Sequence, residues 1–185
     1  MINKNISNII RSRKSIYPKD FNGQEIKKSI ILEILKNANT APTHRLTQPW
    51  FYKVFSGNSK MKLAEEITNY VNLDSEKLRH NFIEKFSKTS HVICICMRRD
   101  PHNSVPEWEE IAATSMAVQN IWLSLVDSFI GGYWSTPKYI SELDAYLRLS
   151  KNERCLGFFH LGLYNNTKER NLPRKDIESD VEWLD

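Results

Sequence analysis

A short polar segment between two prolines, residues 41–50, separates a helical pattern from a strand-like one. Upstream, apolar residues recur at helical spacing from Ile30 to Ala38, and Pro42 ends the helix because the residue before a proline is pushed out of the α region. Downstream, the aromatic and apolar run 50–55 predicts a strand. This corner carries Thr, His, Arg and Gln side chains that suit a polar ligand. An ordinary connection is the other interpretation of the same spacing.

Further periodic patterns extend this alternation over the whole chain. They predict helices at 2–13, 61–71, 78–86, 105–128 and 141–149, and strands at 91–97 and 155–164. The helix at 105–128 is the longest and is apolar nearly all round, which predicts deep burial. A chain of 185 residues is long enough for one domain with a substantial core and too short for two comfortable ones. These patterns alone support a single domain of the α/β or α+β class.

The composition is that of a soluble globular protein, with 41% hydrophobic and 26% charged residues. The net charge of +4 is mild and spread along the chain, which predicts no nucleic-acid partner but would serve an anionic small ligand equally well. No apolar run reaches the length of a membrane helix, and the first residues lack the apolar core of a signal peptide. We therefore expect a cytoplasmic protein with no membrane partner.

The cysteines, histidines and acidic residues of this chain are not spaced like metal ligands. Cys94 and Cys96 alternate within a buried strand, which favours small core residues over metal or redox chemistry. His160 lies in the strand at 155–164 with no second His or acid at ligand spacing, so we expect a satisfied core histidine. The acidic residues that open the long helix, Glu107, Glu109 and Glu110, most simply complement its dipole. We predict no metal site and no catalytic side chain.

The corner also carries a resemblance. It is similar to the A-P-S-x-x-N-x-Q-P-W segment of the nitroreductase family, whose members are homodimeric FMN enzymes. The matching residues are Ala41, Pro42, Gln48, Pro49 and Trp50, with Thr43 in place of Ser. Leu46 stands where most members have an Asn that contacts the flavin. His44 fits a compact subgroup with a His two residues after the Pro, and Thr40 could add a hydroxyl; the resemblance implies that both bind the cofactor.

A second segment, Arg13, Lys14 and Ser15, resembles the R-R-S of the family's R-R-S-x-R signature. By that resemblance these residues hold the ribityl chain and phosphate of FMN, and the fork of an Arg suits two phosphate oxygens. From the residues alone, the same run is a basic helix end that complements the dipole. Tyr17 replaces the final basic residue, which leaves open what stabilises negative charge at N1 of a reduced flavin; Arg45 is one alternative.

Two later segments also resemble the family. The glycines at 131 and 132 suggest a helix cap followed by an aromatic core strand. The resemblance implies instead that Trp134, Ser135 and Thr136 line the isoalloxazine. The tail, about 165–185, is a solvated arm by composition, but it resembles the family's closing R-K-P-L-x-x-x-V-x-W. That comparison assigns Arg174, and with it Lys175, to the FMN phosphate.

Together the resemblances imply a nitroreductase-like α+β fold over residues 1–185. We expect a central mixed β-sheet flanked by helices and a long buried helix at an intertwined homodimer interface. The implied activity is that of an FMN-dependent oxidoreductase, which transfers hydride from NADH or NADPH through flavin N5 to a small acceptor, such as a nitroaromatic or quinone, with ping-pong kinetics. The alternatives are a non-catalytic flavin-binding or flavin-delivery protein and a flavin-dependent dehalogenase or dehydrogenase on the same scaffold.

Overall fold

The computed structural model describes residues 2–71, 73–165 and 173–184. Its helices are α1 (Lys4–Ser12), α2 (Lys28–Ala38), α3 (Gly57–Ile67), α4 (Glu76–Lys88) and α5 (Glu107–Leu123). Its strands are β1 (Trp50–Ser56), β2 (His91–Arg98), β3 (Ile130–Ser135) and β4 (Glu153–Leu163). Short 3-10 helices lie at Pro18–Asp20, His44–Leu46, Ile140–Leu143 and Glu178–Asp180. None of the helices among the described residues is long and apolar enough to cross a membrane.

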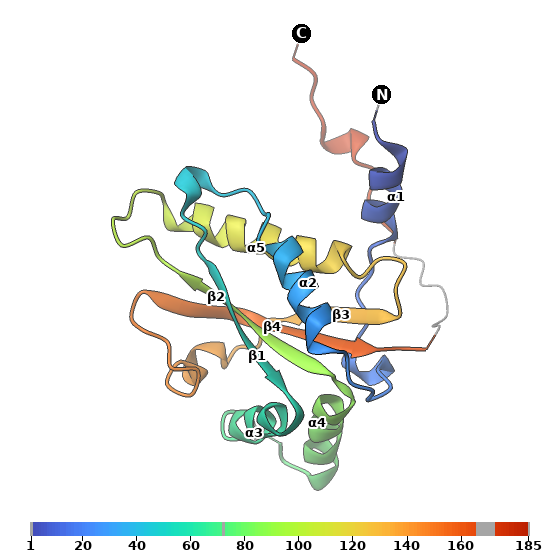
Figure 1. Cartoon of the computed structure of the whole chain (residues 1–185), viewed down its shortest axis with the longest axis vertical. Helices are drawn as coiled ribbons and strands as arrows, with labels where there is room; N and C mark the ends of the chain where they lie inside the picture. Colours follow the sequence, from blue (N-terminus) through green and yellow to red (C-terminus); the bar gives the residue numbers. More distant parts are fainter. Residues whose placement is uncertain (1, 72, 166–172, 185) are drawn as a thin grey trace.

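The four strands form one sheet in the order β1-β2-β4-β3 (Figure 1). We expected a mixed sheet, but every pair among the described strands is antiparallel. The reason lies in the connections: Ser56, at the end of β1, is the register partner of His91, at the start of β2. After β1 the chain forms α3 and α4 and re-enters the sheet at the end where β1 stopped. Strand β2 therefore runs antiparallel to β1.

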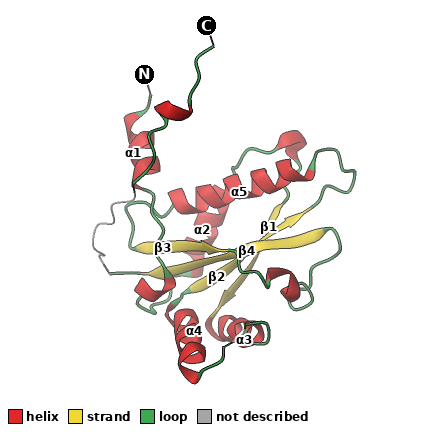
Figure 2. Cartoon of the chain, turned by 180° about the vertical axis from the view of Figure 1, so that it is seen from behind, coloured by secondary structure: helices red, strands yellow, loops and turns green. Residues whose placement is uncertain are grey.

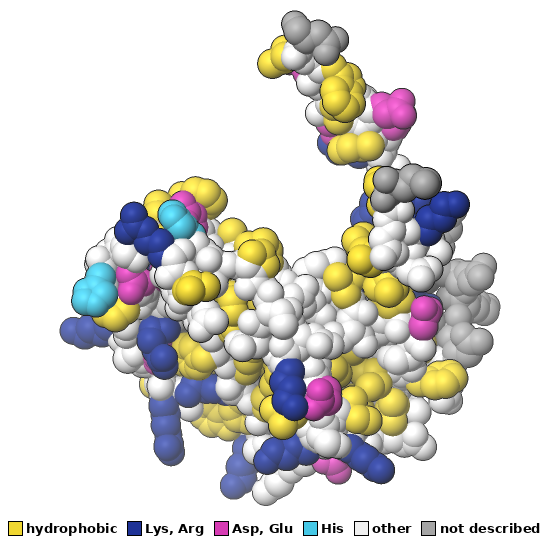
Figure 3. Space-filling model, turned by 45° about the horizontal axis from the view of Figure 1, so that its top comes forward, with side chains coloured by type: hydrophobic (Ala, Val, Ile, Leu, Met, Phe, Trp, Pro, Cys, Tyr) yellow, Lys and Arg dark blue, Asp and Glu magenta, His cyan; other side chains and the backbone are white. Residues whose placement is uncertain are grey.

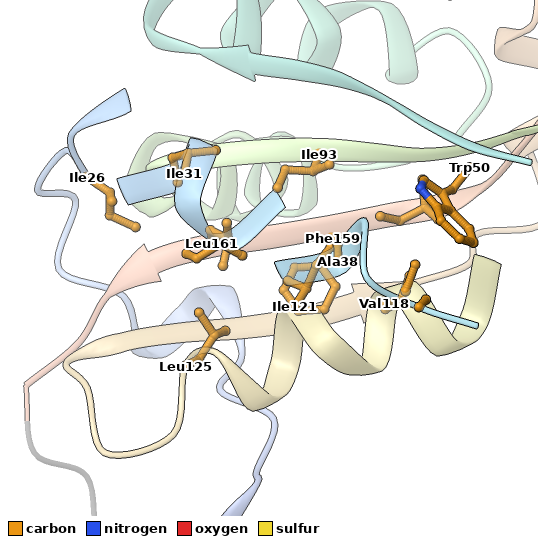
Figure 4. Close-up of a cluster of buried hydrophobic side chains, with 14 of the residues drawn as sticks. Ile26, Ile31, Ala38, Trp50, Ile93, Val118, Ile121, Leu125, Phe159 and Leu161 are labelled. Carbon is orange, nitrogen blue, oxygen red and sulfur yellow. The ribbon is translucent and has the colours of Figure 1, made fainter. Parts of the chain in front are cut away.

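Helices cover both faces of this sheet, which gives three layers and two hydrophobic cores (Figure 1). On one face α2 and α5 pack against Ile93, Phe159 and Leu161, as Figure 4 shows. On the other, α3 and α4 cover the side chains of the intervening residues, including Cys94 and Phe158. Successive strand residues point to opposite faces, so a strand buried on both sides must be apolar throughout, as β2 is. The predicted α+β fold is thus confirmed, and the three cysteines are buried and free.

Three predicted local features were wrong. The long helix ends at Leu123 in a series of turns that includes Asp127 at a positive φ of 57°. The two glycines lie inside β3 and do not cap that helix. A Cβ at position 132 would lie 2.5 Å from the Phe159 ring, so close packing of the chain against itself requires glycine there. The helix predicted at 141–149 is reduced to the 3-10 turn Ile140–Leu143.

The two ends of the chain extend away from the sheet and the helices that cover it. Helix α1 and the described part of the C-terminal arm lie side by side beyond the end of α5 in both ribbon views (Figures 1 and 2). Helix α1 buries none of its residues, although its isoleucines share one face. Figure 3 shows hydrophobic side chains along this extension. The exposed apolar residues on it are Ile2, Ile6, Ile9, Ile10, Ile177, Val181, Trp183 and Leu184.

Candidate functional site

Two arginines from opposite ends of the chain are close enough to interact electrostatically, and one of them, Arg13, lies at the C-terminal end of α5. Arg13 follows α1, and its guanidinium carbon lies 5.3 Å from the centroid of the Trp122 ring. Burial, and secondly the positive charge of Arg174, lower the pKa of Arg13. Within the described part of the chain no acid pairs with either guanidinium. Two cations held together without an acid attract an anion with several oxygens, such as a phosphate.

The residues after Arg13 run along the open edge of β3. The backbone N–H of Ile16 donates a hydrogen bond of 3.0 Å to the carbonyl of Gly132, which fixes this segment against the strand. Lys14 places its ammonium 5.9 Å from the centre of the Tyr164 ring, and Ser15 is half-buried beside it. Three of the residues predicted to bind phosphate and ribityl groups therefore sit together, with the β3 backbone as one wall.

The three residues predicted to line an isoalloxazine do not share one face. Trp134 is opposite Phe159 in the register, on the side of α5, and its Nε1 donates to the Leu156 carbonyl at 3.3 Å. Ser135 is opposite Phe158 and so faces α4. Thr136 lies beyond the strand and also donates to the Leu156 carbonyl, at 3.3 Å. The hydroxyl of Ser135 and the strand backbone remain the available polar groups.

The corner at 41–50 lies at the other end of α5. His44 Nδ1 is 2.6 Å from a carboxylate oxygen of Glu109, in the first turn of that helix. Arg45, Leu46 and Gln48 have positive φ angles of 51°, 55° and 43°. Non-glycine residues in this region carry strain of the kind found at ligand sites, and Asn tolerates it better than Leu. Leu46 thus keeps an unusual backbone conformation at the position where the resembling family has Asn.

Two other predicted residues have partners within the chain. The Thr40 hydroxyl donates to the Asn37 carbonyl at 2.8 Å and lies 3.4 Å from the amide nitrogen of Asn120, at the junction of α2 and α5. The Lys175 ammonium forms an ion pair with Asp180 inside the C-terminal arm. These contacts do not exclude Thr40 or Lys175 from a ligand site. Each contact gives the residue a structural role that needs no ligand.

The predicted site residues therefore form two groups within one chain. The basic group contacts Trp122, and His44 contacts Glu109, 13 residues earlier on α5. At 1.5 Å per residue this separation is about 20 Å along the helix axis. The sequence analysis missed both of these partners, because it gave Trp122 no role and interpreted Glu109 as complementing the helix dipole. The apolar and acidic patterns of α5 contain no signal for either contact.

A cavity of about 480 Å³ lies between α4 and the sheet, on the face opposite α5. Ser135 and His160 line it, together with Tyr17 and residues of α4. We expected His160 to be a satisfied core residue; it is buried, but its Nδ1 has no hydrogen-bond partner among the described residues. Burial, and secondly the charge of Lys85, lower the pKa of His160 to about 4, so its ring is neutral at neutral pH. No cluster of metal ligands occurs among the described residues.

The chain belongs to the nitroreductase family, whose sequence profile matches residues 10–163. The Bacillus subtilis protein YfhC, provisionally named an NAD(P)H nitroreductase, is 28% identical over 172 residues, which cover 89% of this chain and 87% of YfhC. A nitroreductase-like protein of Bacillus cereus has the same fold, with a TM-score of 0.85 at 24% identity over 100% of this chain and 98% of the other. A nitroreductase-type protein of Desulfovibrio desulfuricans, solved with FMN, gives a TM-score of 0.74 at 16% identity, over 98% and 96% of the two chains.

Proposed function

We propose that this protein is an FMN-dependent oxidoreductase that transfers hydride from NADH or NADPH to a small acceptor such as a nitroaromatic or a quinone, in ping-pong order. The observation that carries the proposal is the pair of guanidiniums of Arg13 and Arg174, which interact electrostatically and have no acidic ion-pair partner among the described residues. Membership of the nitroreductase family and the FMN bound by the Desulfovibrio relative support it. FMN, when bound, supplies the redox chemistry, and the protein supplies position and charge.

The candidate site residues suit FMN, which carries a phosphate at one end and a planar ring system at the other. Arg13 and Arg174 offer forked donors to the phosphate, and Lys14 and Ser15 add an ammonium and a hydroxyl. The open edge of β3 presents backbone groups and Ser135 further along the same strand, where the ring would lie. The proposal needs no side-chain nucleophile or general base.

The visible absorption spectrum of the purified protein tests this function. We expect flavin bands, and we expect anaerobic addition of NADH or NADPH to bleach them. Bands that persist with both nucleotides would indicate a flavin-binding or flavin-delivery protein instead. A protein that carries no flavin and takes up no added FMN would overturn the proposal. Steady-state rates with nitroaromatics, quinones and halogenated aromatics would then separate a reductase from a dehalogenase.

We further propose that the protein is a homodimer in which each FMN meets both chains. The roughly 20 Å that separate the basic group from His44 along α5 support this arrangement. A two-fold axis that sets two α5 helices antiparallel would bring the corner of one chain to the basic group of the other. The exposed isoleucine face of α1 and the apolar residues of the arm are surfaces that a second chain would cover.

The substitution Ile6→Glu should shift the protein from dimer toward monomer. Ile6 is 55% exposed in the single chain, and a charge placed in an apolar interface would weaken association at least about tenfold, once in each chain. Sedimentation equilibrium measures the mass against the 21.7 kDa of one chain. Asn8→Glu adds the same charge on the opposite side of α1 and should leave the dimer intact. A wild-type protein that sediments as a monomer would refute the proposal.

A further inference from the structure

The three cysteines of this chain come together in the hydrophobic core between the sheet and the helices α3 and α4. Cys94 and Cys96 alternate along β2, so both side chains point to this face of the sheet. Cys155 comes from the neighbouring strand β4 and is hydrogen-bonded to both of them. All three thiols are free. The sequence placed two cysteines on one face of a strand, and the fold adds the third.

Cys96 and Cys155 are register partners in the antiparallel ladder of β2 and β4. Directly opposite residues of antiparallel strands have Cα atoms about 4.5–5.5 Å apart, and a disulfide spans about 4.4–6.8 Å. Cys94 is opposite Phe158 instead. Cys94 and Cys96 lie two residues apart on one strand, about 6.6 Å at roughly 3.3 Å per residue, and their side chains run parallel, which disfavours a bond between them. The register therefore favours one disulfide, between Cys96 and Cys155.

The backbone around Cys155 is held in place by its neighbours. The carbonyl of Leu156 accepts hydrogen bonds of 3.3 Å from Trp134 Nε1 and from the Thr136 hydroxyl. The Cys155 thiol donates to the carbonyl of Gly157 at 3.4 Å. These contacts hold β4 against β3 at this point, so the sulfur of Cys155 stays opposite β2.

Cys155 is the sulfur of the cluster that ionises most readily. The thiols of Cys94 and Cys96 donate hydrogen bonds to it and lower the pKa of Cys155, although burial opposes this effect. The same hydrogen bonds, and secondly burial, raise the pKa of both donors. The thiolate is the form of cysteine that reacts with peroxides. Cys155 is also the least buried of the three, at 6% exposed against 0% for the other two, so a small oxidant meets it first.

We propose that hydrogen peroxide converts Cys155 and Cys96 into a disulfide, with Cys155 as the sulfur that reacts first. The sulfur of Cys155 attacks one peroxide oxygen, the O–O bond breaks, and a sulfenic acid and water are formed. The Cys96 thiol then attacks this sulfur; the S–S bond forms, the S–O bond breaks, and a second water leaves. The two thiols lose two electrons and two protons, and the peroxide is reduced to two waters. This inference is independent of the proposed function, because no step involves a flavin.

The test treats the folded, reduced wild-type protein with hydrogen peroxide, alkylates the remaining thiols in denaturant, and maps the cysteines by peptide mass spectrometry. We expect the free thiols of each chain to fall from three to one, with Cys96 and Cys155 joined, and dithiothreitol to restore all three. Three retained thiols, or a disulfide that includes Cys94, would overturn the inference. So would a disulfide that forms only in urea, because the pairing of the two strands exists only in the folded chain.

Two alanine variants provide the matched comparison. Cys94→Ala and Cys96→Ala each remove one fully buried sulfur from the same strand, so their effects on folding should be similar, and circular dichroism checks that both are folded. Cys94→Ala should still form the disulfide, whereas Cys96→Ala should form at least about tenfold less, since it lacks the thiol opposite Cys155. Equal yields of disulfide in the two variants would contradict the pairing, and the map of the wild-type protein decides the question if either variant fails to fold.

Discussion

Arg13→Ala should purify with much less FMN than the wild-type protein. The substitution removes a forked cation from the proposed phosphate site and leaves Arg174 without its neighbour. A hydrogen bond to a charged group contributes about 1.5–3 kcal/mol, so we expect the dissociation constant of FMN to rise roughly 10- to 100-fold. Fluorescence titration of the apoprotein with FMN measures this constant, and flavin absorbance at purification gives the occupancy.

Folding should change much less than flavin binding in this variant. Arg13 loses its contact with the Trp122 ring, which contributes about 0.5–1 kcal/mol at an exposed site. Arg11→Ala removes the same charge from an exposed position in the last turn of α1 and should retain FMN as wild type does. Equal flavin affinity in Arg13→Ala and Arg11→Ala would exclude the phosphate role of Arg13.

Arg99→Ala should be the most destabilising of the single substitutions considered, because it leaves Glu110 buried without its cation. The Glu110 side chain is 1% exposed, is paired with Arg99, and accepts a hydrogen bond of 2.9 Å from the Asp100 backbone. Removal of one partner of a buried ion pair costs about 3–5 kcal/mol. Urea unfolding followed by circular dichroism measures the free energy of unfolding.

The neighbouring Arg98 is the matched control. It is paired with Glu153, but its own side chain is 56% exposed, and such pairs contribute about 0–1 kcal/mol. Arg98→Ala should therefore cost far less than Arg99→Ala. The double substitution of Arg99 and Glu110 by leucine should recover much of the loss, since no buried charge remains. Similar losses in the two single alanine variants would contradict the buried-pair interpretation.

The buried pair also illustrates what could be predicted for α5. The helix starts at Glu107, two residues after the predicted start at 105, and the burial expected from its apolar residues is found on the face that carries Ala113, Ala117 and Ile121. The burial of Glu110 in an ion pair with Arg99 was not predicted, because this contact depends on the path of the loop that follows β2. The same limit applies to His44 and Glu109, which are 65 residues apart in sequence.

The candidate site could be predicted as a set of residues but not as an arrangement. Local motifs made Arg13, His44 and Ser135 candidates, since each motif is a short run of residues with its own resemblance. Motifs carry no information on which sheet face a residue occupies or which end of a helix it contacts. The strand register separates the side chains of Trp134 and Ser135, and the length of α5 separates His44 from Arg13.

The sequence by itself determined the family, the α+β class and nearly every helix and strand, because these depend on local periodicity and short motifs. Only the tertiary structure decided the antiparallel pairing of the sheet, the electrostatic interaction of Arg13 with Arg174, and the cavity that Tyr17 and Lys85 both line. The physical reason is common to all three: each depends on contacts between segments far apart in the chain, which are fixed by the packing of whole elements and not by the residues beside them.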